Sequence, residues 1–139
     1  MSLLSDLFVA EPSAALSYEE RLKRKDLSVY DRAEFKGLTR LEFSTLRAFI
    51  SNEEWDLDKH ELEEVTPSGE TWLFRFPERF VDQLSKLGSA GIPDLSKQWA
   101  ATEELQWEPA EAEEVIVALV RLAKKAKLEA KGLYLWGSL

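Results

Sequence analysis

The sequence predicts an α+β fold, in which a small, partly antiparallel sheet of about four or five strands carries helices packed on one face. Three observations lead to this fold class. Apolar stretches of strand length alternate with stretches of helical periodicity. Two strand-like stretches near residues 60–76 flank a turn and predict a hairpin. A long helix then precedes a short terminal strand, and no linker or repeat divides the chain, so we expect a single domain over residues 1–139.

The first part of the chain predicts two strands separated by a helix. Residues 5–10 form an apolar run of strand length that ends before Pro12, and proline suits the first position of a helix. Ser17 and Glu20 have the spacing of a capping box, so the helix begins at either place. Residues 27–38 alternate imperfectly between apolar and polar side chains, which predicts the second strand.

The next helix has a clear N-terminal signal. Thr39 and Glu42 form a capping box, and Leu38 and Phe43 have the spacing of a hydrophobic staple. Apolar side chains then recur at helical spacing as far as Ile50, so one face of this helix must meet a core. The hairpin follows this helix along the chain.

Turn chemistry separates the two strands of the hairpin. Residues 60–65 predict the first strand, and residues 66–69, Thr-Pro-Ser-Gly, predict the turn. The second strand alternates strictly, which places Trp72, Phe74 and Phe76 on one face. We therefore expect this strand to bury an aromatic face.

Prolines mark the expected starts of three helices in the second half of the chain, at Pro77, Pro93 and Pro109. The last of these should run to about Lys131, with acidic residues in its first turns and lysines in its last turns, as the helix dipole favours. Gly132 then has the place of a C′ residue.

The C-terminal stretch, Gly-Leu-Tyr-Leu-Trp-Gly-Ser-Leu, has apolar side chains on both faces if it forms a strand. We expect it to belong to the folded body, because such a segment left in water would promote aggregation. The alternative is a terminal recognition tag that another protein captures.

The composition excludes several kinds of function. The chain has no cysteine, and therefore no disulfide, thiolate nucleophile or thiolate metal site. The first eight residues lack the basic cluster of a secretory signal. The longest nearly uncharged run, residues 115–120, is too short to span a bilayer. We expect a cytoplasmic protein without a membrane anchor.

The net charge of −8 argues against nucleic acid as a partner, because such binding relies on lysine and arginine to neutralise phosphates. Two basic clusters occupy residues 21–25 and 124–127. We interpret both clusters as the C-terminal ends of helices, because cations there complement the helix dipole. The other interpretation is a patch that binds a small anion.

The acidic segment 53–65 combines seven carboxylates with the only histidine of the chain. His60, Asp56 and Asp58 would suit a divalent ion if they converged. The spacing matches neither the H-E-x-x-H motif nor an EF-hand loop. We expect a strand from His60 onward, which would scatter these ligands, and we favour an acidic surface over a metal site.

No catalytic motif is present in the chain. It lacks a G-x-S-x-G elbow and both glycine-rich phosphate-binding patterns, and a catalytic triad would have to use the single histidine. The sequence still allows an enzyme that uses two carboxylates as general acid and general base. Glu70 and Glu78, near the strand of Trp72, are weak candidates for such a pair. The sequence therefore favours a non-enzymatic protein, and we expect no cofactor.

Two tryptophans lie among carboxylates and suggest a surface that binds another protein, although either ring is also suited to covering the edge of a core. The candidate contact residues are Trp55, Trp107, Glu53, Glu54, Glu103 and Glu104. An acidic surface favours a basic partner. Our leading hypothesis is a small acidic binding or regulatory domain, an adaptor or immunity-type inhibitor. The alternative is an enzyme or ligand-binding protein with a carboxylate-lined pocket and a divalent ion near His60.

Overall fold

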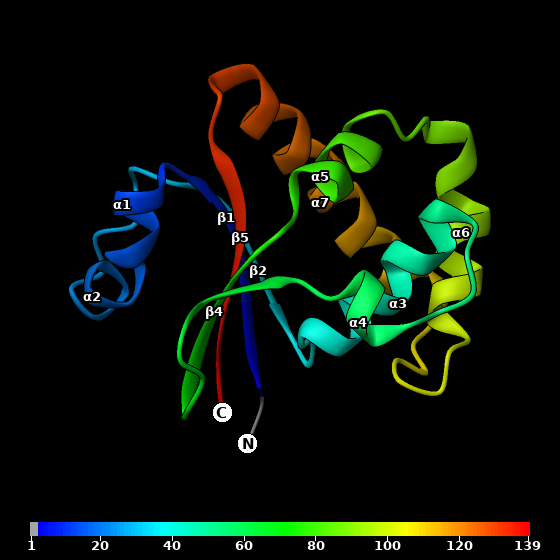
Figure 1. Cartoon of the computed structure of the whole chain (residues 1–139), viewed down its shortest axis with the longest axis horizontal. Helices are drawn as coiled ribbons and strands as arrows, with labels where there is room; N and C mark the ends of the chain where they lie inside the picture. The colour runs from blue at the N-terminus through cyan, green and yellow to red at the C-terminus, as the bar shows by residue number, and fades with distance from the viewer. Residues whose placement is uncertain (1–2) are drawn as a thin grey trace.

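The computed structural model describes residues 3–139. Residues 1 and 2 lie outside this range. They belong to the first eight residues, which we expect not to be a secretory signal. The chain forms a five-stranded antiparallel sheet with the strand order β2-β1-β5-β4-β3 (Figure 1). The strands are β1 (Leu4–Ala10), β2 (Asp31–Lys36), β3 (Glu63–Thr66), β4 (Thr71–Arg75) and β5 (Gly132–Ser138). The predicted fold class is confirmed, including the hairpin of β3 and β4.

Helices cover both faces of the sheet, whereas the sequence led us to expect one covered face (Figure 1). They are α1 (Pro12–Leu16), α2 (Tyr18–Lys23), α3 (Arg40–Ser51), α4 (Leu57–His60), α5 (Glu78–Ser85), the 3-10 turn η1 (Ser89–Gly91), α6 (Ile92–Ala100) and α7 (Pro109–Glu129). The short helices α1 and α2 lie on one side, and α3 to α7 lie on the other. None of the helices within residues 3–139 combines the length and apolar character needed to cross a membrane.

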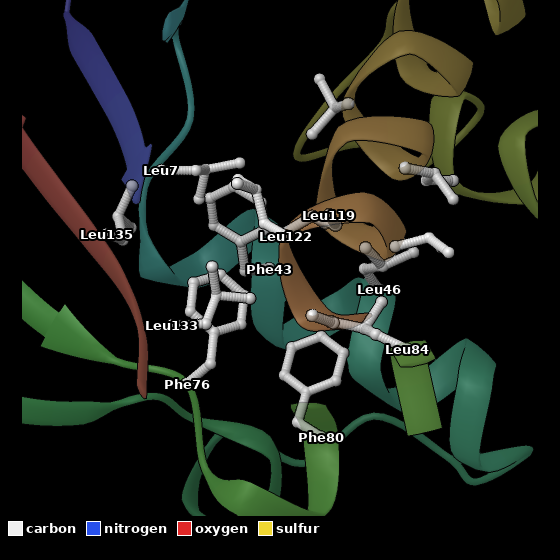
Figure 2. Close-up of a cluster of buried hydrophobic side chains, with 14 of the residues drawn as sticks. Leu7, Phe43, Leu46, Phe76, Phe80, Leu84, Leu119, Leu122, Leu133 and Leu135 are labelled. Carbon is white, nitrogen blue, oxygen red and sulfur yellow. The ribbon is translucent and has the colours of Figure 1, made fainter. Parts of the chain in front are cut away.

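The C-terminal strand β5 is the central strand of the sheet, between β1 and β4. Leu133 and Leu135 face the larger core, where Figure 2 shows them beside side chains from α3 and α7. Tyr134 and Trp136 face the opposite side and join an aromatic cluster with Phe8, which stacks on the ring of a tyrosine from α2. The expectation that this segment belongs to the folded body is confirmed, and its two apolar faces explain why both sides of the sheet are covered.

The N-terminus of α3 forms as the sequence predicts. The Thr39 hydroxyl accepts a hydrogen bond from the Leu41 amide, and the Glu42 carboxylate accepts one from the Thr39 amide at 2.9 Å. Leu38 and Phe43, the two residues of the predicted staple, are both fully buried in the larger core. This capping fixes the residue at which α3 begins. It therefore also fixes which side chains of its last turn face the core and which face solvent.

Three predicted boundaries differ from the structure. The first helix is divided at Ser17, whose side chain caps no backbone amide of α2. The second strand begins at Asp31, because the Tyr30 amide closes a turn onto the Leu27 carbonyl. The long helix ends at Glu129 with Ala130 in the left-handed conformation, so Gly132 lies in β5.

Candidate functional site

The acidic segment after α3 folds back on that helix as a compact corner. Asn52 adopts a left-handed conformation and ends α3. The Asp56 carboxylate then accepts a hydrogen bond from the Asp58 amide at 3.0 Å and starts the single turn of α4. The predicted strand from His60 is wrong: this residue ends α4, and β3 begins at Glu63. The aspartate cap initiates a helical turn that the alternation of side chains did not indicate.

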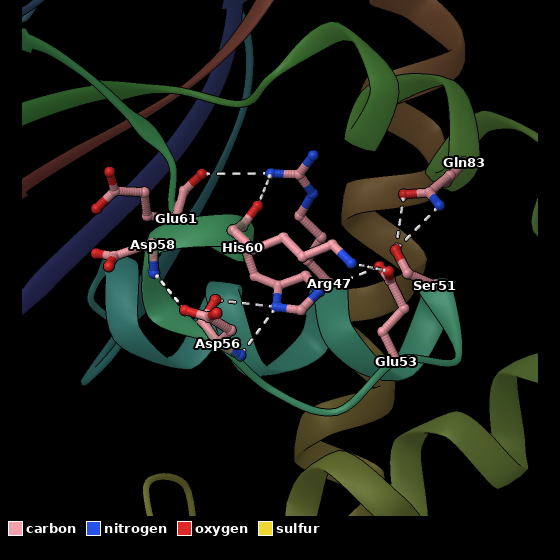
Figure 3. Close-up of polar contacts among 9 residues, drawn as sticks. Arg47, Ser51, Glu53, Asp56, Asp58, His60, Glu61 and Gln83 are labelled. Carbon is pink, nitrogen blue, oxygen red and sulfur yellow. Dashed lines mark hydrogen bonds and ion pairs between the residues drawn. The ribbon is translucent and has the colours of Figure 1, made fainter.

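His60 is buried, with 1% of its surface exposed, and both ring nitrogens contact polar groups (Figure 3). Nδ1 lies 3.1 Å from the amide nitrogen and 3.0 Å from the carbonyl oxygen of Asp56. Nε2 lies 3.3 Å from a carboxylate oxygen of Glu53, whose other oxygen pairs with Lys59. Arg47 on α3 donates to two carbonyl oxygens of the same segment. The His60 ring therefore links α4 to the segment that follows α3, through its contacts with Asp56 and Glu53.

The residues of the metal hypothesis do not converge on one point. The Asp56 carboxylate is used as the cap of α4, and the side chain of Asp58 extends away from the His60 ring (Figure 3). Within residues 3–139 no group of three or more His, Cys, Asp or Glu side chains is placed to hold a metal ion. The contacts of His60 assign it a structural part in this corner.

We expect the substitution His60→Ala to lower the free energy of unfolding by about 1–3 kcal/mol, because it opens a buried space and leaves the Asp56 amide without its partner. Asp58→Ala, in the same segment but exposed, should change stability by no more than about 0.5 kcal/mol. Chemical denaturation measures both. Equal stability of the two variants would contradict the structural part given to His60, and a stoichiometric metal lost only in His60→Ala would restore the metal hypothesis.

Beside this corner lies a small hollow of about 160 Å³ between α3, the segment before α4 and the loop after α6. We call it the Trp55 hollow, and its lining residues are Thr45, Ala48, Phe49, Glu53, Trp55, Thr102 and Glu104. Two large apolar side chains remain exposed in it: Trp55 at 42% and Phe49 at 37% of their surface. The Trp55 indole N–H donates to the Ser44 hydroxyl at 3.0 Å, which holds the ring in place on α3.

The hollow brings together three of the six predicted contact residues, Glu53, Trp55 and Glu104. Glu54 and Glu103 are exposed next to them in sequence but do not line it. Trp107 does not join this surface, because its ring is partly buried against the larger core.

Phe49 also lines the hollow, and sequence reasoning did not include it among the candidates. Its helical spacing with Phe43 and Leu46 assigned it to the buried face of α3, yet it lies at the edge of that face and lines the hollow. Its place only two residues before the end of α3 is the signal that was available, because the last turn of a helix often extends past the core.

Carboxylates concentrate charge around the hollow. The side-chain hydrogen bond from Lys59, followed by the contact with His60, lowers the pKa of Glu53, so this group stays ionised below the usual range of a glutamate. On the neighbouring turn of α3, burial raises the pKa of Glu42, and the charge of Glu104 acts in the same direction. The hollow thus has two carboxylates at its rim, Glu53 and Glu104, of which Glu53 is paired with Lys59, and two aromatic rings between them.

The chain has no match among protein-family models and none among curated proteins. Over its length it is similar to a solved structure, the crystal structure of YfbM from Escherichia coli, itself described as a protein of unknown function. The two share 12% sequence identity with a TM-score of 0.47, and the alignment covers 98% of this chain and 99% of that chain. This likeness carries no information on activity.

Proposed function

We propose that this chain is a small, acidic, non-enzymatic binding domain, such as an adaptor or an immunity-type inhibitor, and that the Trp55 hollow receives a basic side chain of a partner protein. The observation that supports the proposal is the pairing of two exposed aromatic rings, Phe49 and Trp55, with the carboxylates of Glu53 and Glu104 around one hollow. Protein-binding hot spots have this composition, an aromatic anchor within a polar rim.

The chemistry of the hollow favours arginine or lysine as the inserted residue. A guanidinium or ammonium group gains from lying over the face of a tryptophan, and carboxylates at the rim accept its N–H groups in charge-assisted hydrogen bonds. The volume of about 160 Å³ suits one side chain, since sites for drug-sized molecules have about 300–1,000 Å³. The hydrogen bond from Trp55 to Ser44 holds the ring before binding, which reduces the entropy lost on association.

Peptides that differ only at one central residue test this function. A peptide array selects a sequence around a central arginine, and calorimetry then compares arginine, lysine and citrulline at that position. We expect citrulline, which has the shape of arginine without its charge, to bind at least about tenfold more weakly, a loss of about 1.4 kcal/mol. Binding of the arginine peptide should weaken as salt increases, because the attraction is between exposed charges.

Variants of the protein locate the binding. Trp55→Ala and Glu104→Lys should each lower the affinity for the arginine peptide by at least about tenfold. Glu20→Lys makes the same charge change at an exposed position of α2, on the other side of the sheet, and should leave the affinity within about twofold. Equal losses for Glu104→Lys and Glu20→Lys would show an unspecific charge effect and would refute the proposed site.

A further inference from the structure

A larger cavity of about 710 Å³ lies where β4 ends and β5 begins, against α5 and the end of α7. It shares no residue with the Trp55 hollow. Six charged side chains line it: Arg75, Arg79, Lys127, Lys131, Glu78 and Asp82. The cavity thus has an excess of positive charge in a chain whose net charge is −8. A local potential opposite to that of the whole molecule indicates an anionic ligand.

Two of the cations are free to bind such a ligand. Within residues 3–139 neither Arg75 nor Arg79 has a carboxylate within ion-pair distance. Asp82, by contrast, is already paired with Lys127 and with Lys86. The guanidinium of Arg75, which lines the cavity, lies 5.9 Å from the centre of the Tyr134 ring.

Gly132 lines the same cavity beside Arg75 and Tyr134. Tyr134 is buried as a residue, but its hydroxyl is not a buried atom without a partner, since within residues 3–139 only the indole nitrogen of Trp72 is. A Cβ atom on Gly132, which lines the cavity, would lie 3.1 Å from that hydroxyl and 3.2 Å from Nε of Arg75. The Tyr134 ring and the Arg75 side chain thus already occupy the space over Gly132, and the glycine lets both pack against the start of β5.

The N-terminus of α5 adds a second source of donors. Its N-cap is Pro77, which makes no side-chain cap, so no side chain occupies the first amides of this eight-residue helix. Glu78 and Arg79, the first residues of α5, both line the cavity. Free amides at a helix N-terminus bind phosphate oxygens well.

We propose that this cavity binds a small molecule that carries a phosphate monoester. Two arginines and the first amides of α5 offer donors to the several oxygens of a phosphate, and arginine matches phosphate geometry with two parallel hydrogen bonds. The volume lies within the range of about 300–1,000 Å³ that is usual for small-molecule sites, and exceeds what the phosphate alone fills. This site is separate from the Trp55 hollow, and neither proposal depends on the other.

Titration with ribose 5-phosphate, followed by NMR of the backbone amides, tests the proposal, with ribose as the neutral comparison. We expect ribose 5-phosphate to shift the amides of Arg79 and Gly132, and ribose to shift neither. Arg75→Met and the exposed Arg79→Met should each weaken binding at least about tenfold. Arg121→Met, on an exposed position of α7 outside the cavity, should not. Gly132→Ala should also weaken binding, because its Cβ would press on the Tyr134 ring and displace the Arg75 side chain.

Three results would overturn the proposal: no binding at low-millimolar ribose 5-phosphate, equal binding of ribose, or equal losses in Arg79→Met and Arg121→Met. A lipid headgroup offers the same phosphate chemistry, so sedimentation with vesicles of phosphatidylcholine and phosphatidic acid forms a separate arm. Sedimentation that requires Arg79, without binding of ribose 5-phosphate, would assign the site to a membrane lipid and reject the small molecule.

Discussion

Deletion of residues 133–139 is expected to abolish cooperative folding of the chain. These residues form nearly all of β5, which pairs with β1 along one edge and with β4 along the other. Without β5 the sheet separates into two two-stranded pieces, and such pieces are barely stable alone. The deletion also removes Leu133 and Leu135 from one core and Tyr134 and Trp136 from the other. At about 1.5–3 kcal/mol for each large buried side chain, the loss approaches the whole stability of a typical domain.

Thermal unfolding followed by near-ultraviolet circular dichroism measures this effect. We expect the shortened chain to show no sigmoidal transition and little aromatic signal. Removal of Leu139 alone, which is 65% exposed, should lower the midpoint of unfolding by only a few degrees. A cooperative transition near that of the full chain, with loss only of a binding partner, would instead favour the terminal recognition tag.

The second large effect is expected at Gly137, which lies opposite Trp72 in the pairing of β4 and β5. A Cβ atom at residue 137 would overlap Nε1 and Cε2 of the Trp72 indole and lie 2.8 Å from its Cζ2. The ring thus occupies the space over the glycine and cannot keep its position beside alanine. We expect Gly137→Ala to lower the free energy of unfolding by about 1–3 kcal/mol, the usual cost of overpacking.

A double-mutant cycle separates this clash from the loss of backbone flexibility. Trp72→Leu removes the overlapping ring and also a buried indole N–H that has no partner within residues 3–139. In that background Gly137→Ala should cost at least about 1 kcal/mol less than in the natural sequence. Gly88→Ala is the matched control, because a Cβ there meets no atom within 4 Å. Strict additivity of the two substitutions would show that Trp72 does not determine the need for glycine.

Local signals in the sequence predicted those parts of the fold that neighbouring residues determine. The capping box of Thr39 and the strict alternation around Phe74 each involve residues a few positions apart, and both formed as expected. The position of β5 depends on its pairing with β1, more than a hundred positions away in sequence, and with β4, about 60 positions away, and no local pattern contains that information. The covering of the second face of the sheet, by α1 and α2, depends on the same long-range pairing.

The candidate site was predictable to the extent that sequence neighbours form it. Glu53 and Trp55 lie two residues apart, and the structure keeps them together. Glu104 reaches the same hollow only because α6 packs beside α3, and the partly buried ring of Trp107 belongs to the core instead. The buried position of His60 depends on the cap of a four-residue helix, which a search for strand periodicity does not detect.

Mapping of the bound arginine peptide on the protein by NMR tests the proposed function most directly. We expect the shifted amides and the indole signal of Trp55 to cluster around the hollow, at Phe49, Glu53 and Glu104. The same titration with the citrulline peptide should leave these signals in place. A footprint on another face, or equal shifts with citrulline, would contradict the proposal that the Trp55 hollow binds a basic side chain.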